Sequence, residues 1–546
     1  MEKNISQLDE VQYIAYGTQT KRFSVGNVTT VKGEDIAKQP VNNVMLALQG
    51  RVPGLTVIQQ TGVNGGAVKI RIQGENSINS GNNPLIVIDG VPYPTDLPMD
   101  ASSIELIGNG GFGSPLSFLN TNDIESVDVL KDADATSIYG SRAANGAILI
   151  TTKKGKPGKM RVNINLQQGW SKVSRKMKLL DRRQYLDMRY EAINNSGMIP
   201  TDNRALFPPY VYAPDLLLWD TTRSTDWQEE LIGETAQYSN YNASVSGGTA
   251  TTSYLVGLTY NRQTDVFPGN HALTSGGLHF NLNTASLNQR FKLQFTASSA
   301  VTDNQLPGID LTNDALKLVP VAPALFNADT LNWELDRAGK QSWNNPLVNS
   351  YRMQFNSISR SLTSNLTAGY TFLPGLELRT QLGFSQAQSN SSGKTLLTAI
   401  PPSLRSFSTN RAGFSNVSTS TLIAEPQLTY NRHFGKLRFD GLVGGTLQQN
   451  FSQNWNMEGQ GYTSDLLLNG ITGAATTTQF FDKSIYKYNA LFTRLGLNFD
   501  NQYLLNFSGR RDGSSRFGDK RRFHDFGSVG LGWIMSEARW MESLAP

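Results

Sequence analysis

A glycine-rich segment is the strongest candidate for chemistry in this sequence. Residues Gly108–Gly113 read GNGGFG, match the G-x-G-x-x-G pattern of dinucleotide sites and follow the apolar run Ile104–Ile107. Asp128 and Asp132 lie roughly 20 residues further on, where such a site places its acidic residue. The crossover would have to be Ser114–Asn122, which is short and contains a proline, whereas parallel strands need a crossover of about a dozen residues or more. We therefore expect a flexible glycine loop here, and an oxidoreductase is the less favoured alternative.

The remaining reactive residue types do not form a recognisable site. The chain has no cysteine, which excludes thiolate metal sites and cysteine nucleophiles. Its histidines fall in separate predicted hairpins without carboxylates at ligand spacing, so we expect rim or girdle positions rather than zinc ligands: His271, His279, His433 and His524. The segment Asp512–Ser515 does not fit the spacing of a calcium loop. We expect no catalytic residues, no metal and no cofactor, and hence no enzyme.

Length and composition favour a large β-rich protein. The 546 residues exceed what one hydrophobic core usually organises, and 50 glycines with 10% aromatic residues suit many short strands and turns. No run of 18 apolar residues occurs, so no transmembrane helix is predicted, although barrel strands stay possible. The net charge of +5 is mild and the basic residues are scattered, which argues against a nucleic-acid partner.

The segment up to residue 158 predicts a compact α+β unit. Turn residues such as Asn64-Gly65, Asp89-Gly90 and Asn145-Gly146 separate apolar runs that are rich in β-branched residues. The expected strands are Ala67–Ile72, Pro84–Asp89, Ile124–Leu130 and Ala147–Lys153. The expected helical segments are Gly33–Ala37, Val41–Gln49 and Ala133–Tyr139, the last with Asp132 as N-cap and Gly140 just past its end.

The stretch Asp132–Lys156 reads as a helical hook followed by a returning strand. We expect Ile138, Tyr139, Ile148 and Ile150 to pack it into the small domain as a structural staple. A phosphate-binding loop is the alternative, but no Lys-Ser/Thr pair follows a strand at the required spacing.

From residue 159 onward the pattern changes to strict alternation of apolar and polar residues. It is clear in Phe291–Ala297, Leu376–Phe384, Leu491–Phe499 and Val529–Trp533. Short connections are predicted at Gly247–Ala250, Ala285–Asn288, Leu373–Gly375, Arg432–Lys436 and Asp500–Gln502. Long ones are predicted at 171–236, 303–354, 391–412, 453–477 and 512–523, with a shorter one at 263–270. Alternating short turns and long loops are typical of an outer-membrane barrel, and the pattern predicts about 12 strands.

Aromatic residues flank several of the short turns, as in the interfacial girdle of a membrane barrel. They are Tyr370, Phe372, Tyr430, Phe434, Phe499 and Tyr503. A soluble β-sandwich or propeller would explain the alternation. It would not explain loops of this length, and no repeat near 40 residues, the length of a propeller blade, is present.

Several motifs resemble one family closely. The sequence LKDADATSIYGSRAANGAILITTKKGK at Leu130–Lys156 is similar to the plug signature of SusC/RagA-family TonB-dependent transporters of the Bacteroidota outer membrane. Leu48–Gly62, Ile70–Gly74 and Asn82–Tyr93 resemble it too, and Arg510–Gly518 looks like a barrel loop of the same family. The resemblance implies a small α+β plug domain followed by an antiparallel transmembrane β-barrel, 22-stranded in the family.

The resemblance also implies an organisation and a set of partners. It suggests residues 1–20 as a TonB-box leader, 21–158 as the plug and 159–546 as the N-terminal part of the barrel. The TonB-box candidate is Glu10, Val11, Gln12, Tyr13, Ile14 and Ala15, a short segment that could add a strand to a partner's sheet, although Gln12 and Tyr13 interrupt the usual valine run. The implied partners are TonB with its inner-membrane energy-coupling complex, a SusD-like surface lipoprotein and outer-membrane lipid. Loops would be extracellular, with the plug and N-terminus on the periplasmic side.

The implied function is TonB-driven import of oligosaccharides or peptides, with a receptor or signalling protein as the alternative. Two Gly/Asn-rich plug loops, 75–83 and 108–114, are the candidates for facing substrate, with residues Asn76, Asn79, Asn82, Asn83, Asn109 and Phe112. The family's signal peptide and preceding domain are not seen, and the pattern stops after about half of the expected strands. We therefore expect a fragment with the plug and about half the barrel, whose own transport activity is in doubt.

Overall fold

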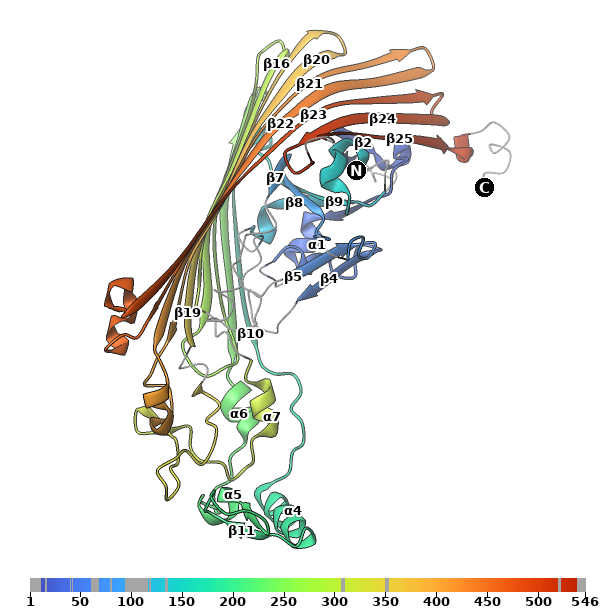
Figure 1. Cartoon of the computed structure of the whole chain (residues 1–546). Coiled ribbons are helices and arrows are strands. Elements are labelled where there is room, and N and C mark those ends of the chain that lie inside the picture. The colour runs from blue at the N-terminus through green and yellow to red at the C-terminus, as the bar shows by residue number, and fades with distance from the viewer. Residues whose placement is uncertain are drawn as a thin grey trace.

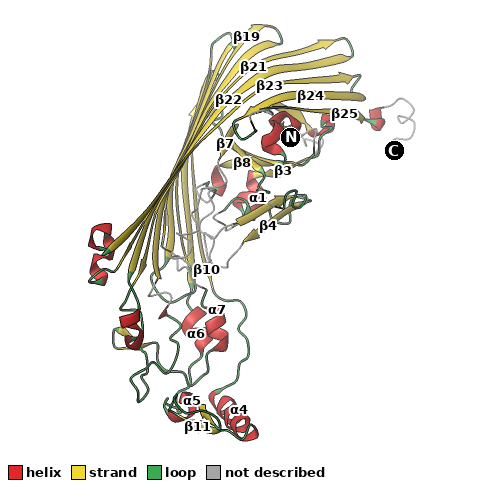
Figure 2. Cartoon of the chain, viewed as in Figure 1, coloured by secondary structure: helices red, strands yellow, loops and turns green. Residues whose placement is uncertain are grey.

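The computed structural model divides the chain into a small plug and a large curved sheet, here called the wall, with the plug on its concave side (Figure 1). It describes residues 11–14, 17–39, 41, 43–59, 68–78, 81–93, 116, 119–132, 136–305, 310–348, 353–518 and 522–537. Figure 2 shows that strands dominate the wall, while the helices belong to the plug and to the loops below the wall.

The plug is built on a five-stranded sheet in the order β3-β8-β9-β6-β7. Its strands are β3 (Val28–Lys32), β6 (Leu85–Ile88), β7 (Val91–Tyr93), β8 (Ile124–Leu130) and β9 (Ala147–Thr152). Two hairpins stand beside it: β1 (Val11–Ile14) with β2 (Gly17–Thr20), and β4 (Leu55–Gln59) with β5 (Val68–Ile72). The predicted strand Ile124–Leu130 is confirmed residue for residue, and the other three plug strands agree to within two residues at each end in the described part.

The plug's helical segments are shorter than predicted. Helix α1 (Gly33–Ala37) is confirmed, whereas the predicted helix Val41–Gln49 is wrong and only a 3-10 turn at Leu46–Leu48 forms. The Asn43 side chain accepts a hydrogen bond from the Met45 backbone N–H at 3.0 Å, a local turn that competes with a helix. Other 3-10 turns are Lys21–Phe23 and Thr121–Asp123.

The third predicted helix, Ala133–Tyr139, lies partly outside the described residues. What is described is a 3-10 segment, η5 (Ser137–Ala143), which runs through Gly140 at a φ of 63°. Gly140 therefore has the left-handed conformation expected of a helix-ending glycine, but the chain continues in a helical turn beyond it.

The wall is a single 12-stranded antiparallel sheet in which every strand pairs with its neighbours along the chain, as the alternation predicted. Its strands are β10 (Gly158–Ser171), β13 (Ala236–Gly248), β14 (Thr252–Thr264), β15 (Ala272–Ala285), β16 (Phe291–Asn304), β19 (Met353–Leu373), β20 (Leu376–Thr395), β21 (Arg411–Phe434), β22 (Leu437–Gln460), β23 (Thr476–Phe499), β24 (Tyr503–Ser514) and β25 (Phe523–Trp533).

All five predicted short turns are confirmed at one end of the wall, and the long loops leave the opposite end. The strands are longer than expected, however: β21, β22 and β23 each have 24 residues. Residues 453–460, predicted as loop, continue β22 because they stay paired with β23. Likewise Arg510–Ser514, the start of a predicted barrel loop, belongs to β24.

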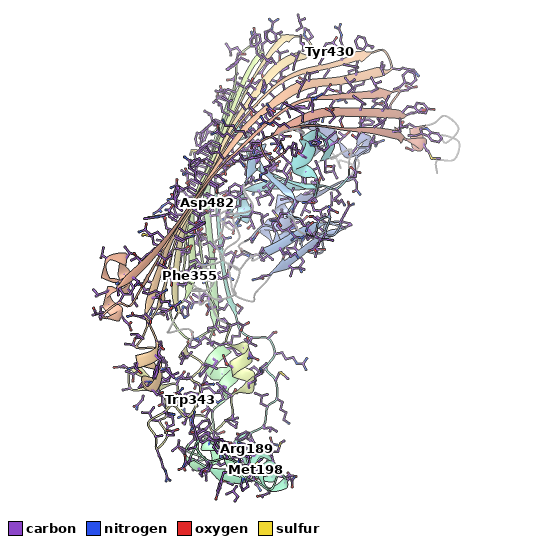
Figure 3. The ribbon with its side chains drawn as sticks, viewed as in Figure 1. Arg189, Met198, Trp343, Phe355, Tyr430 and Asp482 are labelled. Carbon is purple, nitrogen blue, oxygen red and sulfur yellow. The ribbon has the colours of Figure 1, made fainter. Side chains whose placement is uncertain are left out.

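The girdle aromatics lie at the short-turn end, where Figure 3 labels Tyr430. Tyr370, Phe372, Phe434, Phe499 and Tyr503 are all at least two-fifths exposed, as expected for side chains on the outer face of a barrel. Among the described residues, no helix is long and apolar enough to cross a membrane.

The long loops pack together into one unit, here called the loop cap. Its apolar core joins Trp227, Phe267, Leu311, Trp343 and Ala399, which come from four different loops. Its elements are α4 (Arg182–Asn195), α5 (Pro214–Leu217), α6 (Trp227–Ile232), α7 (Thr312–Lys317), β11 (Ile199–Thr201), β12 (Tyr210–Tyr212), β17 (Phe326–Asn327) and β18 (Thr330–Leu331). Further 3-10 turns are Pro402–Phe407, Asp465–Asn469 and Ile471–Gly473 in the loops and Met535–Glu537 after β25.

Candidate functional site

The candidate site is the interface between the plug and the inner face of the wall. The plug segments that contact it include the hook (Ser137–Ala143), the strap (Lys153–Gly155) and the turn (Asp89–Pro92). The hook lies against β23, β24 and β25, while β7, at the end of the turn, lies against β19, β20 and β21.

The hook is fixed by Asp512 on β24. Asp512 Oδ2 accepts hydrogen bonds from the Ser141 backbone N–H at 2.8 Å and from Ser141 Oγ at 3.1 Å. A Cβ at Gly140 would lie 2.0 Å from the same oxygen, so glycine is needed both for the positive φ and for this close approach. The hook also shares hydroxyl contacts with the wall, from Ser137 Oγ to Ser508 Oγ at 2.6 Å and to Ser528 Oγ at 3.0 Å.

Arg510 holds Asp512 from the wall side. Its Nε lies 2.6 Å from Asp512 Oδ1, and the two side chains are 1% and 0% exposed, so the pair is fully removed from water. One Nη donates to the Ile138 carbonyl of the hook and the other to Tyr488 Oη at 2.9 Å. The guanidinium also lies 5.0 Å from the centre of the Phe492 ring, a cation–π distance.

A second arginine, Arg142, extends this network from the plug. Its guanidinium lies 3.9 Å from Glu425, donates to Gln448 Oε1 at 2.5 Å and lies 4.6 Å from the centre of the Tyr488 ring. Thr446 Oγ1 donates to Glu425 at 2.9 Å and accepts from Arg510. The latch, defined as Arg142, Glu425, Arg510 and Asp512, therefore contains two cations and two carboxylates in one buried network.

The strap and the turn make polar contacts without an ion pair. The Gly155 N–H donates to Asn281 Oδ1 at 3.0 Å, and Ser253 Oγ donates to the Gly155 carbonyl at 2.9 Å. At the turn, Asn365 Nδ2 donates to the Asp89 carbonyl at 2.7 Å and Ser385 Oγ to the Pro92 carbonyl at 3.2 Å. These bonds go to backbone carbonyls and amides, so they fix the path of the plug chain against the wall.

One buried carboxyl lies next to the strap. Burial raises the pKa of Asp123, an effect that the nearby His279 partly offsets. His279 is 2% exposed and contacts Ser298 Oγ at 2.9 Å and the Lys153 carbonyl at 3.0 Å. The expectation that every histidine lies at the rim or girdle is therefore wrong for His279, which faces the plug from the inner side of β15.

The latch is a polar interface between the plug and the wall. Its charges pair with each other across the interface, and removing one partner would leave a buried unpaired charge. Separating the plug from the wall would instead expose both members of each ion pair to water, which solvates them. A small apolar contact accompanies the latch, in which Leu442 and Phe492 of the wall pack in one cluster with Ile138 and Tyr139 of the hook.

The predicted TonB-box candidate is only partly described. Val11, Gln12, Tyr13 and Ile14 form β1, whose backbone pairs with β2 from Val11↔Thr20 to Ile14↔Gly17, while Glu10 and Ala15 lie outside the described residues. The candidate backbone is therefore already engaged in a local hairpin. Its role as a partner strand stays a prediction.

The predicted substrate-facing residues form an internal network where they are described. Asn82 Oδ1 accepts from the backbone N–H groups of Asn76 and Ser77, each at 2.8 Å, and Asn82 is 9% exposed. Asn83 Oδ1 accepts from Arg71 at 2.7 Å. Asn82 thus organises its own loop, while Asn79, Asn109 and Phe112, with the whole Gly108–Gly113 segment, lie outside the described residues.

Sequence reasoning missed the latch. It predicted that Ile138 and Tyr139 staple the hook into the plug, and both are buried, but their cluster also contains Leu442 and Phe492 of the wall. Arg510 and Asp512 are two residues apart in a strand, so they share one face, and the alternation that starts at Tyr503 places that face inward. Extending the alternation through the segment read as a loop would have found them. In the part of the chain that the structure describes, no group of three metal-ligating side chains occurs.

Comparison with known proteins agrees with this architecture. Residues 20–147 match the family model described as the TonB-dependent receptor plug domain. The TonB-dependent receptor SusC of Bacteroides thetaiotaomicron is 29% identical over 98% of this chain and 52% of its own length. The TonB-dependent receptor P26 of Formosa agariphila is 29% identical over 98% of this chain and 51% of its own length. The chain thus spans about half the length of the curated relatives it matches.

Solved structures show the same fold. The RagAB peptide importer in an open-open state superposes with a TM-score of 0.79 at 24% identity, over 96% of this chain and 58% of that one. The ferric citrate transporter FecA superposes with a TM-score of 0.53 at 12% identity, over 93% of this chain and 60% of that one. A plug against a barrel-type wall indicates an outer-membrane β-barrel protein. In sequence and in fold the chain is therefore similar to TonB-dependent transporters of the SusC/RagA type, and residues 20–147 match the plug domain of TonB-dependent receptors.

Proposed function

We propose that this chain supplies the plug and part of the barrel wall of an outer-membrane importer for oligosaccharides or peptides, driven by TonB. The observation that carries the proposal is the buried latch between the plug hook and the wall. A plug that is held by two cations and two carboxylates blocks the passage of cargo along the wall and can still be displaced. We further propose the boundaries 1–20 for the leader, 21–158 for the plug and 159–546 for the wall.

Import requires a path past the plug, and the latch governs whether it opens. Pulling on the N-terminal side of the plug would separate Arg142 and Ser141 from Glu425 and Asp512. The hook ends four residues before β9, a central strand of the plug sheet, so force on that sheet reaches the latch directly. Segments with few buried apolar contacts to the wall are the natural ones to move first.

The force would enter through Glu10–Ala15. A partner strand from TonB would add to this segment by backbone pairing, which requires the β1–β2 hairpin to open or to offer its other edge. A four-pair hairpin is marginal on its own, so this exchange costs little.

The loop cap would face the cell exterior and carry the partner surface for a SusD-like lipoprotein. Exposed apolar residues gather in the segment around β11 and β12 (Figure 3 labels Met198 there), among them Phe207 at 82% and Ile199 at 49% exposure. The cargo would be bound between this lid and the plug. In this proposal the protein performs no covalent chemistry.

The test is uptake by the natural full-length protein, with and without Glu10–Ala15, in a host that lacks its own copy. Labelled oligosaccharides and peptides serve as cargo, and outer-membrane abundance is measured for both forms. The proposal predicts that deletion abolishes uptake while abundance stays the same. Equal uptake by both forms would contradict energy-driven import, and no uptake by either form would favour a receptor without transport.

A further inference from the structure

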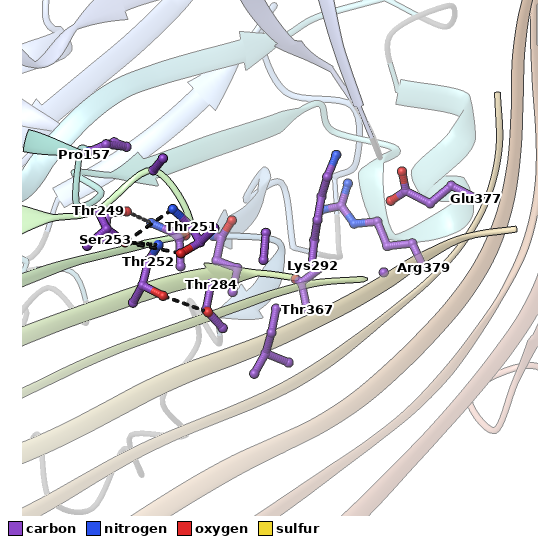
Figure 4. Close-up of a pocket in the computed structure, with 16 residues that line it drawn as sticks. Pro157, Thr249, Thr251, Thr252, Ser253, Thr284, Lys292, Thr367, Glu377 and Arg379 are labelled. Atoms are coloured by element: carbon purple, nitrogen blue, oxygen red, sulfur yellow. Dashed lines mark hydrogen bonds between the residues drawn. The ribbon is translucent and has the colours of Figure 1, made fainter. Parts of the chain in front are cut away.

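A cavity of about 440 Å³ lies on the inner face of the wall at its short-turn end (Figure 4). It is formed by strands β14, β15, β16, β19 and β20 together with Pro157, where the strap leaves the plug. Cavities of this size hold one or two sugar rings or a short peptide. Cargo that reaches the short-turn end of the barrel interior would meet it.

Two cations line one side of the cavity. The strand register pairs Lys292 with Gly369 and Gly369 with Arg379, so both side chains project from the same inner face with only a glycine between them. Figure 4 shows Lys292, Arg379 and Glu377 pointing to the same side of the sheet. The Glu377 carboxylate reaches toward this glycine, since a Cβ at residue 369 would lie 2.8 Å from Glu377 Oε1, so the two cations share the space at Gly369 with one carboxylate.

These cations differ from others at the same rim. Lys436 is paired with Asp500 at 2.5 Å and Arg438 with Asp440 at 3.1 Å. Among the described residues, the side chains of Lys292 and Arg379 make no hydrogen bond or ion pair, although Glu377 exerts an attraction on Arg379. The charges of Lys292, Arg379 and Glu377 together give one net positive charge that faces the cavity.

The opposite side of the cavity is lined by polar side chains. Thr249 and Thr251 lie there in the turn between β13 and β14, and Ser253 and Asn283, which also bond to the Gly155 carbonyl, face it from the inner side of β14 and β15. Gln294 projects from β16, two residues after Lys292 and therefore on the same face. Hydroxyl and amide groups bond to the hydroxyls or amides of a polar ligand, while the cations select for an anionic oxygen.

We propose that this cavity is an exit subsite for a carboxylate-bearing cargo unit, with Lys292 and Arg379 binding the carboxylate and the hydroxyl and amide groups of the opposite side contacting the rest of the ligand. This inference rests on the proposed import function and adds a cargo class to it. Uronic-acid oligosaccharides and acidic peptides share the required chemistry, so the test includes both.

The experiment measures binding to the detergent-solubilised natural full-length protein by titration calorimetry. The probes are trigalacturonate, triglutamate and the neutral maltotriose. Lys292→Gln/Arg379→Gln is compared with Arg432→Gln/Lys436→Gln, which also removes two cations from the short-turn rim but touches no cavity residue. We expect the cavity variant to bind one of the acidic probes about tenfold more weakly, the ratio expected on losing charge-assisted hydrogen bonds, while the control binds as the unchanged protein does.

The pattern of results separates the outcomes. Weaker binding of trigalacturonate alone assigns the site to acidic sugars, and weaker binding of triglutamate alone assigns it to acidic peptides. The subsite would be overturned if the unchanged protein bound neither acidic probe. It would also be overturned if both double variants lost binding of an acidic probe to the same extent. Uptake of the neutral cargo is measured in parallel in cells. The proposed import function fails only if the unchanged protein shows no TonB-dependent uptake, whatever the binding result.

Discussion

Arg510 shows at the residue scale how a wall can hold a plug without fusing to it. The residue meets Asp512, the Ile138 carbonyl, Tyr488 and Thr446, so each of its nitrogen atoms has an acceptor. Burying an ion pair removes its charges from water, which costs free energy. This cost is recovered only when the two charges are in close contact and their remaining hydrogen-bonding groups are satisfied. The latch is therefore stable when closed, and hydration of its charges compensates for the lost contacts when it opens.

Gly140 gives the sharpest prediction at this scale. Gly140→Ala would place a Cβ 2.0 Å from Asp512 Oδ2 and strain a φ of 63°, so the hook should separate from the wall. We expect the backbone strain alone to cost about 1–2 kcal/mol and the lost latch contacts to add to it. The measurement is hydrogen exchange at the Ser141 amide in the full-length protein, with a gain of at least tenfold in exchange rate expected.

Gly50→Ala is the matched control for this prediction. Gly50 has a φ of 74° but nothing within 4 Å of a Cβ, so the substitution adds backbone strain without a clash. Protection at Ser141 should be unchanged in this variant. If both variants lost protection equally, general destabilisation of the plug rather than the latch would be responsible.

At the scale of elements, the loop cap behaves as a small domain with its own core. Trp227 and Trp343 come from different loops, and their ring centres lie 6.2 Å apart. Their indole N–H groups donate to the carbonyls of Val319 at 2.8 Å and Asn332 at 3.1 Å. The loops are therefore held together as one packed unit.

Trp343→Ala should release the cap and leave the wall intact. Trp343 is 6% exposed, and truncating a buried tryptophan costs about 3–5 kcal/mol. Hydrogen exchange should rise in α6 and α7 but not in β21 or β22. Trp170→Ala, at a residue that is 67% exposed on β10, is the control and should leave the cap protected. Loss of protection throughout the wall in Trp343→Ala would show that the cap is not a separate unit.

Asp465 joins the loop 461–475 to the loop 396–410, and it makes the contact between these loops dependent on pH. Burial alone would raise the pKa of Asp465, but hydrogen bonds from the backbone of Thr398 and Leu397 and from Asn410 outweigh it and lower the pKa. A lowered carboxyl pKa adds stability that is present above the unfolded value, about 3.9, and is lost as the pH falls through the folded value. The contact between 396–410 and 461–475 should therefore weaken below about pH 4.

Spin labels on the exposed positions Leu404 and Leu466 can follow this change, since the chain has no cysteine that would interfere. The distance distribution should broaden as the pH falls from 6 to 3. Asp465→Asn should show the broad distribution already at pH 6, because an amide has one oxygen where the carboxylate has two. A narrow distribution in Asp465→Asn would contradict the role of the charge.

Regular elements were predictable from the sequence where the local pattern determines the structure. The alternation in Leu376–Phe384 identified β20, and Asn145-Gly146 located the turn before β9. Strand ends were less predictable, since residues 453–460 are strand only because β23 continues beside them. The latch was not predicted, because Arg142 and Arg510 are 368 positions apart and only the curvature of the wall brings them together.

At the scale of the whole molecule, the described part of the plug meets the wall at the hook, the strap, the turn and residues 120–123, and of these four the hook carries the buried ion network. The strap and the turn bind through uncharged hydrogen bonds to their backbone groups. A displacement that opens the latch while the strap remains attached would create a path on the side of β23–β25 and return the plug to the same place.

The most direct test locks the hook to the wall with a reversible disulfide. Ser137 Oγ and Ser508 Oγ lie 2.6 Å apart across the interface, so Ser137→Cys/Ser508→Cys should form a bond there. Ser508→Cys/Ser528→Cys, whose hydroxyls lie 2.7 Å apart within the wall, is the control that cross-links no plug residue. In the natural full-length protein, we predict that the oxidised hook variant loses TonB-dependent uptake, that a reductant restores it, and that the control imports normally in both states. If the oxidised hook variant took up cargo as fast as the unmodified protein, opening of the latch would not be required for import, because cargo would then pass while the hook stays bound to the wall.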